Sequence, residues 1–471
     1  MRIFWATVGV LLSCGNHAAP PPPRHDAAAT AAPDTASLEL APHPLGMPDL
    51  DGFGWRKRAG QPAFRTARKA EGREDWPNVV VACKQALAAD PGHLEAAWLY
   101  AVALAKTGSQ GAITGPLATA AAGDFGKWAT ASLEQPALQP YLATPVGAAW
   151  RRRVEADRAL YVAALARSIV VTAAGDLYAV DQAPAGPRWY RLTRTYGGVI
   201  AAFAAPDGRH IAYVTRTRGR GNGAMKLGAG VVDLATGHTS RAVELVPPAT
   251  IAFSTAKPAG FWIGQGASVR LLDDDGVATP TKLKRPSGAW IDVTVGGGVH
   301  VHRLPVAGIS ADWDDQSLAS AIKLASSNRV VTVPSPGLID GNTLVWSSDR
   351  AHVAFIAQIS DHCSTGPKLP GTPNTAAFVA DAATGTVTEL ERAAGGIAIT
   401  WLAERKLAIA GDNGVSTVEL GGTPVKLDGA TGLATPRRKP RCLPDVADEP
   451  VTTDDDPPES GDLTIDAGAG K

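Results

Sequence analysis

The residues of this 471-residue sequence that could do chemistry are few, and none has the neighbours that its chemistry needs. Ser320 and Lys323 have the spacing of a serine–lysine pair, but the companion motifs of that chemistry do not accompany them. His300 and His302 fall on one face of an expected strand and could ligate a metal, yet no cysteine or run of carboxylates completes the set. The acidic turn 273–276 lacks the glutamate that closes a calcium loop. We therefore expect no catalytic residue, no metal and no cofactor.

A basic segment is the remaining candidate for recognition. Arg216, Arg218 and Arg220 alternate just before a Gly-Asn-Gly sequence, and a loop here could bind an anionic partner. A solvated loop between two strands is the alternative. Lys+Arg and Asp+Glu number 45 each, so the formal net charge is zero and we expect no nucleic-acid partner. The sequence contains no HExxH, GxSxG, paired CxxC or Walker A motif.

Residues 1–13 have the features of a secretory signal. The apolar run 3–12 follows a positive start and is too short to cross a bilayer as an ordinary helix. It ends at Ser13-Cys14, and a small residue before a cysteine at this place resembles the lipobox of bacterial lipoproteins. The resemblance implies cleavage between Ser13 and Cys14 and acylation of Cys14, with the outer membrane favoured because Gly15 follows. An ordinary secretory signal cleaved near Gly15 is the alternative.

Two segments of biased composition lie near the ends of the chain. Residues 14–60 are rich in alanine and proline, and residues 437–471 begin with a basic cluster and then turn acidic. Neither segment holds enough apolar side chains to offset the entropy of ordering its backbone. We therefore expect a disordered tether over 14–60 and a disordered tail over 437–471.

Residues 61–167 have helical periodicity. Apolar side chains recur at helical spacing over 74–89 and over 94–106. Ala86 and Pro91 match the small-residue and proline positions of the tetratricopeptide repeat, which these paired helices resemble. The resemblance implies a module that binds other proteins. Because it covers fewer repeats than independent stability requires, we expect this module to lean on the rest of the chain.

Residues 168–436 consist of short apolar runs separated by turns. Within 199–218, two such runs flank Pro206-Asp207-Gly208, and these residue types supply the fixed φ, the side-chain bond and the positive φ of a tight turn. Turns of this kind recur about every 40 residues, the length of a four-stranded blade. The segment 204–214 resembles the repeat of TolB-type, WD-repeat-like β-propellers. We therefore expect a multi-domain α plus all-β protein, with a tetratricopeptide-like helical module followed by a six- or seven-bladed β-propeller.

The cysteines beyond Cys14 have different expected roles. Cys363 lies in a Gly/Pro-rich insertion and Cys442 follows the last expected strand, so the two could form a disulfide in an oxidising envelope. A Cα separation above about 7 Å would exclude this bond. Cys83 lies on the apolar face of a helix and is expected in the core.

These features favour a non-catalytic lipoprotein of the bacterial envelope that acts as a protein-binding scaffold. Its expected partners are other envelope proteins, and its expected membrane contact is the N-terminal lipid alone. Many propellers of the TolB type precede a peptidase domain of the α/β-hydrolase fold, which we do not expect after this one. Two alternatives remain open: an enzyme or small-ligand binder that uses the propeller funnel, and a cell-wall-binding or sensor protein.

Overall fold

A computed structural model describes residues 40, 43–50, 58–205, 207–218, 225–254, 260–286, 288–295, 298–303, 306–326, 329–360 and 373–439. The predictions on Ser13, Cys14, Pro206, Arg220, Cys363 and Cys442 and on the side chain of Arg218 lie outside these residues. Within these ranges, no helix is both long enough and apolar enough to cross a membrane.

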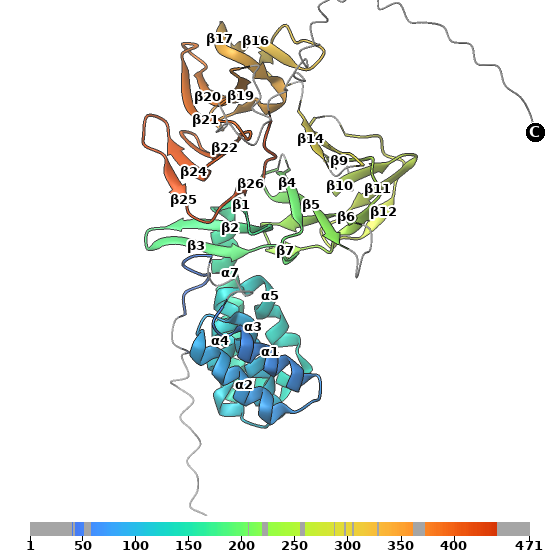
Figure 1. Cartoon of the computed structure of the whole chain (residues 1–471), viewed down its shortest axis with the longest axis vertical. Helices are drawn as coiled ribbons and strands as arrows, with labels where there is room; N and C mark the ends of the chain where they lie inside the picture. The colour runs from blue at the N-terminus through green and yellow to red at the C-terminus, as the bar shows by residue number, and fades with distance from the viewer. Residues whose placement is uncertain are drawn as a thin grey trace, which may run out of the picture. The chain divides into compact units, whose positions relative to one another are not determined.

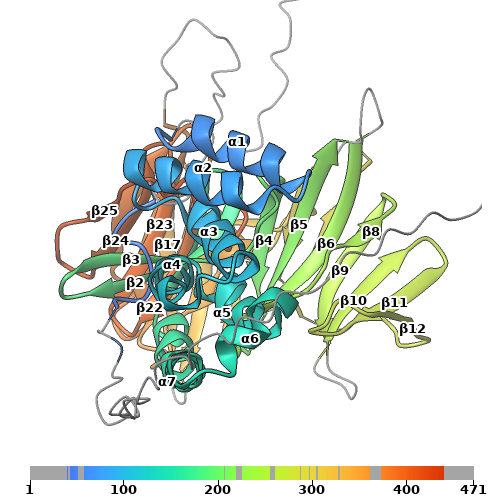
Figure 2. The same ribbon diagram turned by 90° about the horizontal axis from the view of Figure 1, so that it is seen from below.

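The first part of the described chain is helical. Its elements are α1 (Gln61–Glu71), α2 (Trp76–Ala89), α3 (Leu94–Lys106), η4 (Gln110–Ala112), α4 (Thr114–Gly123), α5 (Phe125–Glu134), η5 (Pro136–Leu138), α6 (Gln139–Leu142) and α7 (Pro145–Ala166). Helix α3 confirms the helix predicted over 94–106. Side-chain caps fix three of the helix starts: Asp75 accepts from the N–H of Asn78, His93 from that of Ala96 and Thr144 from that of Gly147. From α1 to α5, each helix packs on the next in chain order (Figure 2).

The strands of the described residues form five antiparallel sheets. The first contains β1 (Ile169–Ala173), β2 (Asp176–Ala183), β3 (Gly186–Arg191) and β26 (Gly432–Leu433). The second contains β4 (Val199–Ala204), β5 (His210–Arg218), β6 (Met225–Asp233), β7 (His238–Thr239) and β8 (Val243–Leu245). The third contains β9 (Ala249–Ser254), β10 (Gly260–Gln265), β11 (Ser268–Leu272), β12 (Ala278–Pro280), β13 (Trp290–Val293) and β14 (Val299–His302).

The fourth sheet contains β15 (Ile309–Ser310), β16 (Leu318–Ser326), β17 (Arg329–Asp340), β18 (Val345–Trp346), β19 (His352–Gln358), β20 (Thr375–Asp381) and β21 (Val387–Ala393), with the 3₁₀ turn η6 (Gly341–Thr343) after β17. The fifth contains β22 (Ala398–Ala403), β23 (Lys406–Gly411), β24 (Gly414–Glu419) and β25 (Val425–Leu427).

The strand order is that of a β-propeller. The sheets follow one another along the chain (Figure 1), and β26 then returns to pair with β1 through Val171↔Leu433 and Thr172↔Gly432. The last strand therefore completes the first sheet, which protects an edge that would otherwise stay open. The third and fourth sheets hold six and seven strands, more than the four of a regular blade. A count of six or seven blades therefore stays a prediction.

The turn between β4 and β5 is held by the side chain of Asp207. Its Oδ1 accepts hydrogen bonds from the backbone N–H groups of Arg209 (2.9 Å) and His210 (3.1 Å). Gly208 has a φ of +67°, a conformation that costs glycine little. Asp207 therefore stabilises the turn through its side chain, and this structural role accounts for an Asp-Gly pair at this position without any catalytic function.

Buried aromatic rings and an ion pair join the helices to the first sheet. Tyr161 of α7 belongs to the same apolar core as Tyr190 of β3, and their ring centroids are 5.7 Å apart. The Arg194 guanidinium pairs with the buried Asp124 carboxylate, with 3.0 Å between Nε and Oδ2. Helices and sheets thus share one core, in line with the expectation that the helical module leans on the rest of the chain.

Part of the predicted tether 14–60 is folded, which corrects its extent. Met47 and Trp189 exchange two backbone hydrogen bonds of 3.3 and 2.9 Å, and the N–H of Gly46 donates to the carbonyl of Ala122 at 2.6 Å. Leu45 packs against the shared core. Apolar side chains recur here within a proline-rich segment, and their burial offsets the entropy of ordering the backbone locally.

The basic cluster at the start of the predicted tail 437–471 is also folded. The backbones of Arg438 and Ile397 exchange hydrogen bonds of 3.0 and 2.7 Å. The Arg438 guanidinium pairs with Asp340, with 2.6 Å between Nε and Oδ2. The prediction of disorder is therefore wrong at 437–439, because a carboxylate from β17 neutralises a charge that the local sequence leaves unpaired.

Candidate functional site

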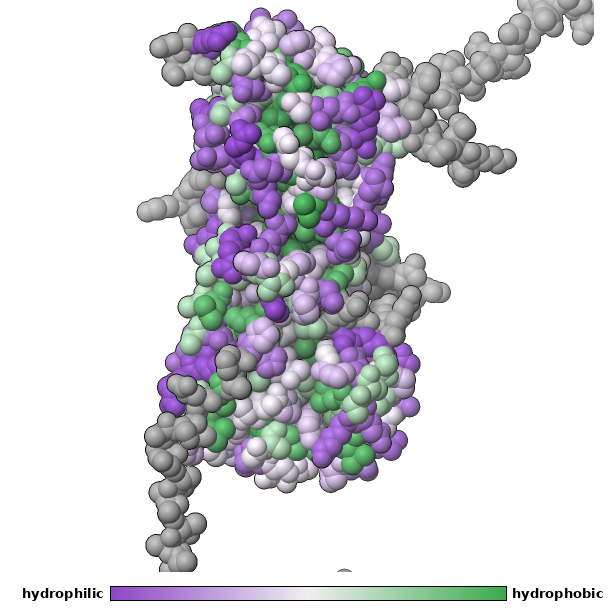
Figure 3. Space-filling model, turned by 90° about the vertical axis from the view of Figure 1, so that its left-hand side faces the viewer, coloured by the Kyte–Doolittle hydropathy of each residue, from purple (hydrophilic) through white to green (hydrophobic). Residues whose placement is uncertain are grey.

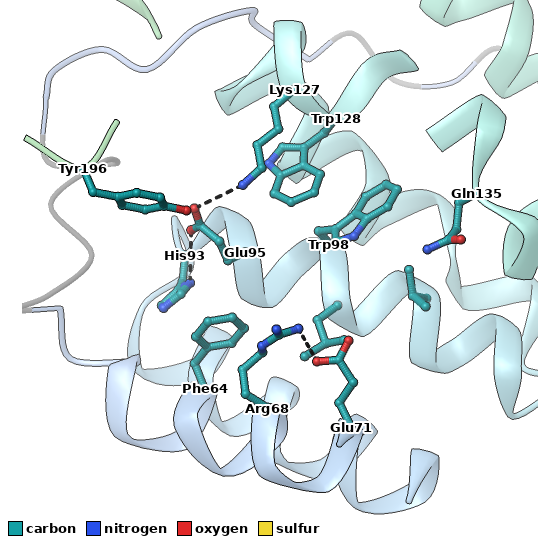
Figure 4. A pocket seen from close by; sticks show the side chains of 12 residues that line it. Phe64, Arg68, Glu71, His93, Glu95, Trp98, Lys127, Trp128, Gln135 and Tyr196 are labelled. Atoms are coloured by element: carbon teal, nitrogen blue, oxygen red, sulfur yellow. Dashed lines mark hydrogen bonds and ion pairs between the residues drawn. The ribbon is translucent and has the colours of Figure 1, made fainter. Parts of the chain in front are cut away.

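A groove between helices α1, α3 and α5 is the site that the structure favours. It encloses a cavity of about 520 Å³. Its lining is half aromatic and aliphatic and half charged or amide (Figure 4), and comprises Phe64, Arg68, Glu71, His93, Glu95, Trp98, Leu99, Val102, Lys127, Trp128, Gln135 and Tyr196. All of these residues belong to the helical part except Tyr196, which comes from the segment between β3 and β4.

Two tryptophans form the apolar wall of this groove. The rings of Trp98 and Trp128 are stacked, with centroids 4.7 Å apart and an interplanar angle of 20°. Phe64 of α1 lies against His93, with ring centroids 4.7 Å apart. A stacked aromatic surface offers a large contact area at a small cost in side-chain entropy, which suits it to hold an apolar or aromatic group of a ligand.

The indole N–H of Trp128 has no hydrogen-bond acceptor among the described residues. The side chain is buried, with 8% of its surface exposed. In Figure 4 the ring lies beside Lys127 on the wall of the cavity. Because this nitrogen has almost no accessible surface, a ligand in the groove would contact the ring of Trp128 and not its N–H.

The charged groups of the groove occur in pairs of opposite sign. Lys127 Nζ lies 3.7 Å from Glu95 Oε1 and 3.9 Å from the centroid of the Trp128 ring. Burial lowers the pKa of Lys127, and the Glu95 carboxylate partly opposes that shift. Arg68 and Glu71 form a second pair on α1. Because each cation has a carboxylate beside it, the groove carries little net charge.

His93 connects the groove to the start of α3. Its Nδ1 accepts the backbone N–H of Ala96 at 3.2 Å, and its Nε2 lies 3.0 Å from Oε1 of Gln61. An accepting Nδ1 assigns the proton to Nε2, which then donates to Gln61. Burial lowers the pKa of His93, which favours this neutral form. A second proton on the ring would break the cap of α3.

Tyr196 is the residue of this lining that comes from the strand-containing part of the chain. It lies between β3 and β4 with a φ of +57°, and 59% of its surface is exposed. Figure 4 shows its ring pointing toward Glu95 and Lys127. The guanidinium carbon of Arg191 lies 5.8 Å from the centroid of the Tyr196 ring, and this contact helps to hold the ring in place.

The residues singled out from the sequence do not converge on this groove. Ser320 and Lys323 are both exposed on β16, and neither lines the groove. His302 bonds to Asp292, with 3.0 Å between Nε2 and Oδ2, and stacks on Trp290. Asp273 accepts from the N–H groups of its own turn, as a tight turn requires.

The predicted basic loop is corrected in part. Arg216 and Arg218 belong to β5, where they pair in register with Leu227 and Met225 of β6. Pairing with β6 therefore continues through these arginines, and the strand ends later than predicted.

One further cluster is assembled from distant turns. His210 Nδ1 lies 2.6 Å from Asp207 Oδ2, and its Nε2 lies 3.2 Å from Asp274 Oδ1 in the turn after β11. His210, Asp233 and Asp274 are a group of metal-ligating types whose atoms fall within 4.8 Å of one another. Both carboxylate oxygens of Asp233 accept from Arg209, at 2.7 and 2.6 Å, so an ion here would have to displace the arginine.

Large apolar side chains elsewhere on the surface are scattered. Those with high exposure include Val81 on α2 and Leu160 on α7, which belong to separate helices. On the face drawn in Figure 3, hydrophobic residues are interspersed with hydrophilic ones. The groove is therefore a better candidate for ligand binding than any of these single apolar residues.

Comparisons with known proteins add no established function. No family model matches the chain, and no curated protein matches it. Solved structures with partial similarity include a functionally unknown protein from Desulfotomaculum acetoxidans (15% identity over 59% of this chain and 86% of that chain, TM-score 0.26). TolB from Acinetobacter baumannii is 12% identical over 56% of this chain and 64% of TolB, with a TM-score of 0.27. A streptogramin B lyase is 14% identical over 50% of this chain and 85% of that chain, with a TM-score of 0.25. Similarities of this size carry no conclusion about activity, ligand or partner.

Proposed function

We propose that the protein is a non-catalytic, lipid-anchored envelope protein whose helical groove binds an extended peptide segment of another envelope protein. The observation that carries this proposal is the stacked pair of Trp98 and Trp128 rings, which form an aromatic wall of the cavity. A peptide supplies backbone carbonyl acceptors at every residue, and its side chains can fill the space beside the stacked Trp98 and Trp128 rings.

The charge pattern of the groove favours a peptide backbone over a strongly charged ligand. Lys127 is matched by Glu95, and Arg68 is matched by Glu71. A ligand of high net charge would have to break these pairs, whereas a neutral backbone can bond to their remaining donors and acceptors. Helices α1, α3 and α5 share the groove, and helix-pair stacks of the tetratricopeptide type often use such a face to hold peptides.

The proposed location rests on the sequence before the folded part. The pair Ser13-Cys14 after an apolar run supports a lipid anchor, and residues 15–42 would then separate the folded part from the membrane. We propose the outer membrane because Gly15, and not an aspartate, follows Cys14. Mass spectrometry of the native N-terminus would test this, since an unmodified Cys14 contradicts the anchor.

A photo-crosslinking experiment tests the groove itself. A photoreactive amino acid replaces Arg68, which is exposed at the rim of the groove, in protein expressed in its native envelope. The matched control places it at Lys84, which is exposed on α2 and does not line the cavity. We expect protein adducts from position 68, their loss when Trp128→Ala is added, and none from position 84.

Two results would overturn the proposal. The first is an equal set of adducts from positions 68 and 84, because contact would then not depend on the groove. The second is an unchanged set of adducts from position 68 after Trp128→Ala in protein that circular dichroism shows to be folded. A random peptide library displayed on phage and selected against the purified protein provides an independent readout, since Trp128→Ala should abolish capture of the selected peptides.

A further inference from the structure

A second cavity lies among the sheets, away from the helical groove. It has a volume of about 910 Å³ and is lined by the β13–β14 hairpin, by residues 315–317, by Asn342 of η6 and by residues 437–439. Pockets of a few hundred to about 1,000 Å³ commonly hold small molecules. The helical groove shares none of these residues, so the two sites are independent.

Two arginines lie near each other here: Arg438 lines this cavity, and Arg303 lines a small hollow that adjoins it. Arg438 lines the cavity and pairs with Asp340, with 2.6 Å between Nε and Oδ2. Val301, Asn342 and Arg438 also line an adjoining hollow, and Arg303 lines that hollow with them. Arg303 is therefore a neighbour of Arg438, and the Asp340 carboxylate is already bonded to Arg438.

Arg303 lacks a side-chain partner among the described residues. Its backbone N–H donates to Oδ1 of Asn342 at 3.0 Å, but its guanidinium makes no hydrogen bond or ion pair there. Burial and the positive charge of Arg438 lower the pKa of Arg303. Guanidinium groups in proteins normally bond to carboxylates, phosphates or carbonyl oxygens. A partly buried cation without such a partner loses part of its hydration free energy and has no interaction that compensates for the loss.

We propose that this cavity binds a small molecule through a carboxylate or phosphate group held by Arg303 and Arg438. An oxyanion between the two guanidinium groups can accept hydrogen bonds from both, and such charge-assisted bonds are among the strongest in proteins. Lys439 adds positive charge on the same side.

Other lining residues fit the uncharged part of such a ligand. His302 stacks on Trp290, with ring centroids 4.8 Å apart, and bonds to Asp292. Asp292, Thr294 and Ser317 also line the cavity and can accept or donate hydrogen bonds to hydroxyl groups. A small polar molecule with one acidic group therefore matches this lining.

Isothermal titration calorimetry with the purified full chain tests this site. The probes are inorganic phosphate, citrate and gluconate, each titrated separately, so that saturation by phosphate alone or by the carboxylates alone identifies the anionic group. We expect saturable binding by at least one probe. Arg303→Gln should weaken it by about tenfold or more, as loss of a charge-assisted bond predicts, while Arg303→Lys should retain most of it. The control Lys84→Gln removes the same charge from an exposed helix position and should leave binding unchanged.

A stability measurement separates a ligand-binding arginine from a structural one. In the absence of any probe, Arg303→Met should leave the melting temperature unchanged or raise it, because it removes a cation that has no partner. A marked fall in melting temperature for Arg303→Met would assign the side chain a structural role and overturn the proposal. Absence of saturable binding with all three probes, or equal weakening in Lys84→Gln, would also overturn it.

Discussion

The ion pair between Arg194 and Asp124 should stabilise the packing of the helices against the first sheet. Asp124 is 4% exposed, and Arg194 reaches it across the boundary between the helical part and the segment after β3. Arg194→Met keeps most of the side-chain volume but leaves a buried carboxylate without its cation. Breaking one half of a buried ion pair typically costs 3–5 kcal/mol. Because the Arg194 side chain is 24% exposed and water can reach the pair, we expect about 3 kcal/mol, near the lower limit.

The assay is urea unfolding followed by circular dichroism, combined with limited proteolysis between helices and sheets. The double variant Asp124→Asn with Arg194→Met should recover at least about 1 kcal/mol relative to Arg194→Met, since it no longer buries a charge. Arg68→Met is the matched control, because it breaks an exposed pair and should cost less than about 1 kcal/mol. The reasoning is refuted if Arg194→Met costs no more than Arg68→Met, or if the double variant is less stable than Arg194→Met.

The other predictions concern the groove and the membrane anchor. Trp128→Ala removes one ring of the stacked pair, so affinity for a peptide selected by display should fall by about tenfold or more in fluorescence anisotropy, and an unchanged affinity in folded protein would show that this ring does not contact the ligand. Burial lowers the pKa of His93, so as pH falls the unfolded chain takes up this proton before the folded protein does, and the folded protein should lose stability below the ordinary pKa of 6.5. His93→Asn keeps a residue that can cap α3, so melting curves between neutral and mildly acidic pH should show a weaker dependence of stability on pH for this variant. An equally steep dependence would contradict the assignment. Cys14→Ala should move the protein from the membrane fraction to the soluble fraction of lysed cells, and retention in the membrane would count against lipid anchoring.

Much of the local structure could be predicted because its causes are local. The periodic apolar residues of 94–106 define α3, and the Asp-Gly pair at 207–208 defines the turn between β4 and β5. The errors arise where a distant group changes the balance. Arg438 belongs to a segment of disordered composition, yet Asp340 of β17 pairs with it and fixes it in place. Met47 is similarly held by Trp189 of β3.

The sequence by itself determined the order of helices followed by strands, the turn chemistry and the candidate anchor at Cys14, since each depends on residues close together in the chain. Only the tertiary structure decided where ligands could bind. The groove combines Phe64, Trp98, Trp128 and Tyr196 from four separate segments, and the hollow that adjoins the second cavity brings Arg303 beside Arg438 across more than a hundred residues. Periodicity can mark a tryptophan such as Trp98 as apolar, but it cannot show that the ring borders a cavity. That property depends on how whole elements pack, and packing is set by contacts between residues far apart in the chain.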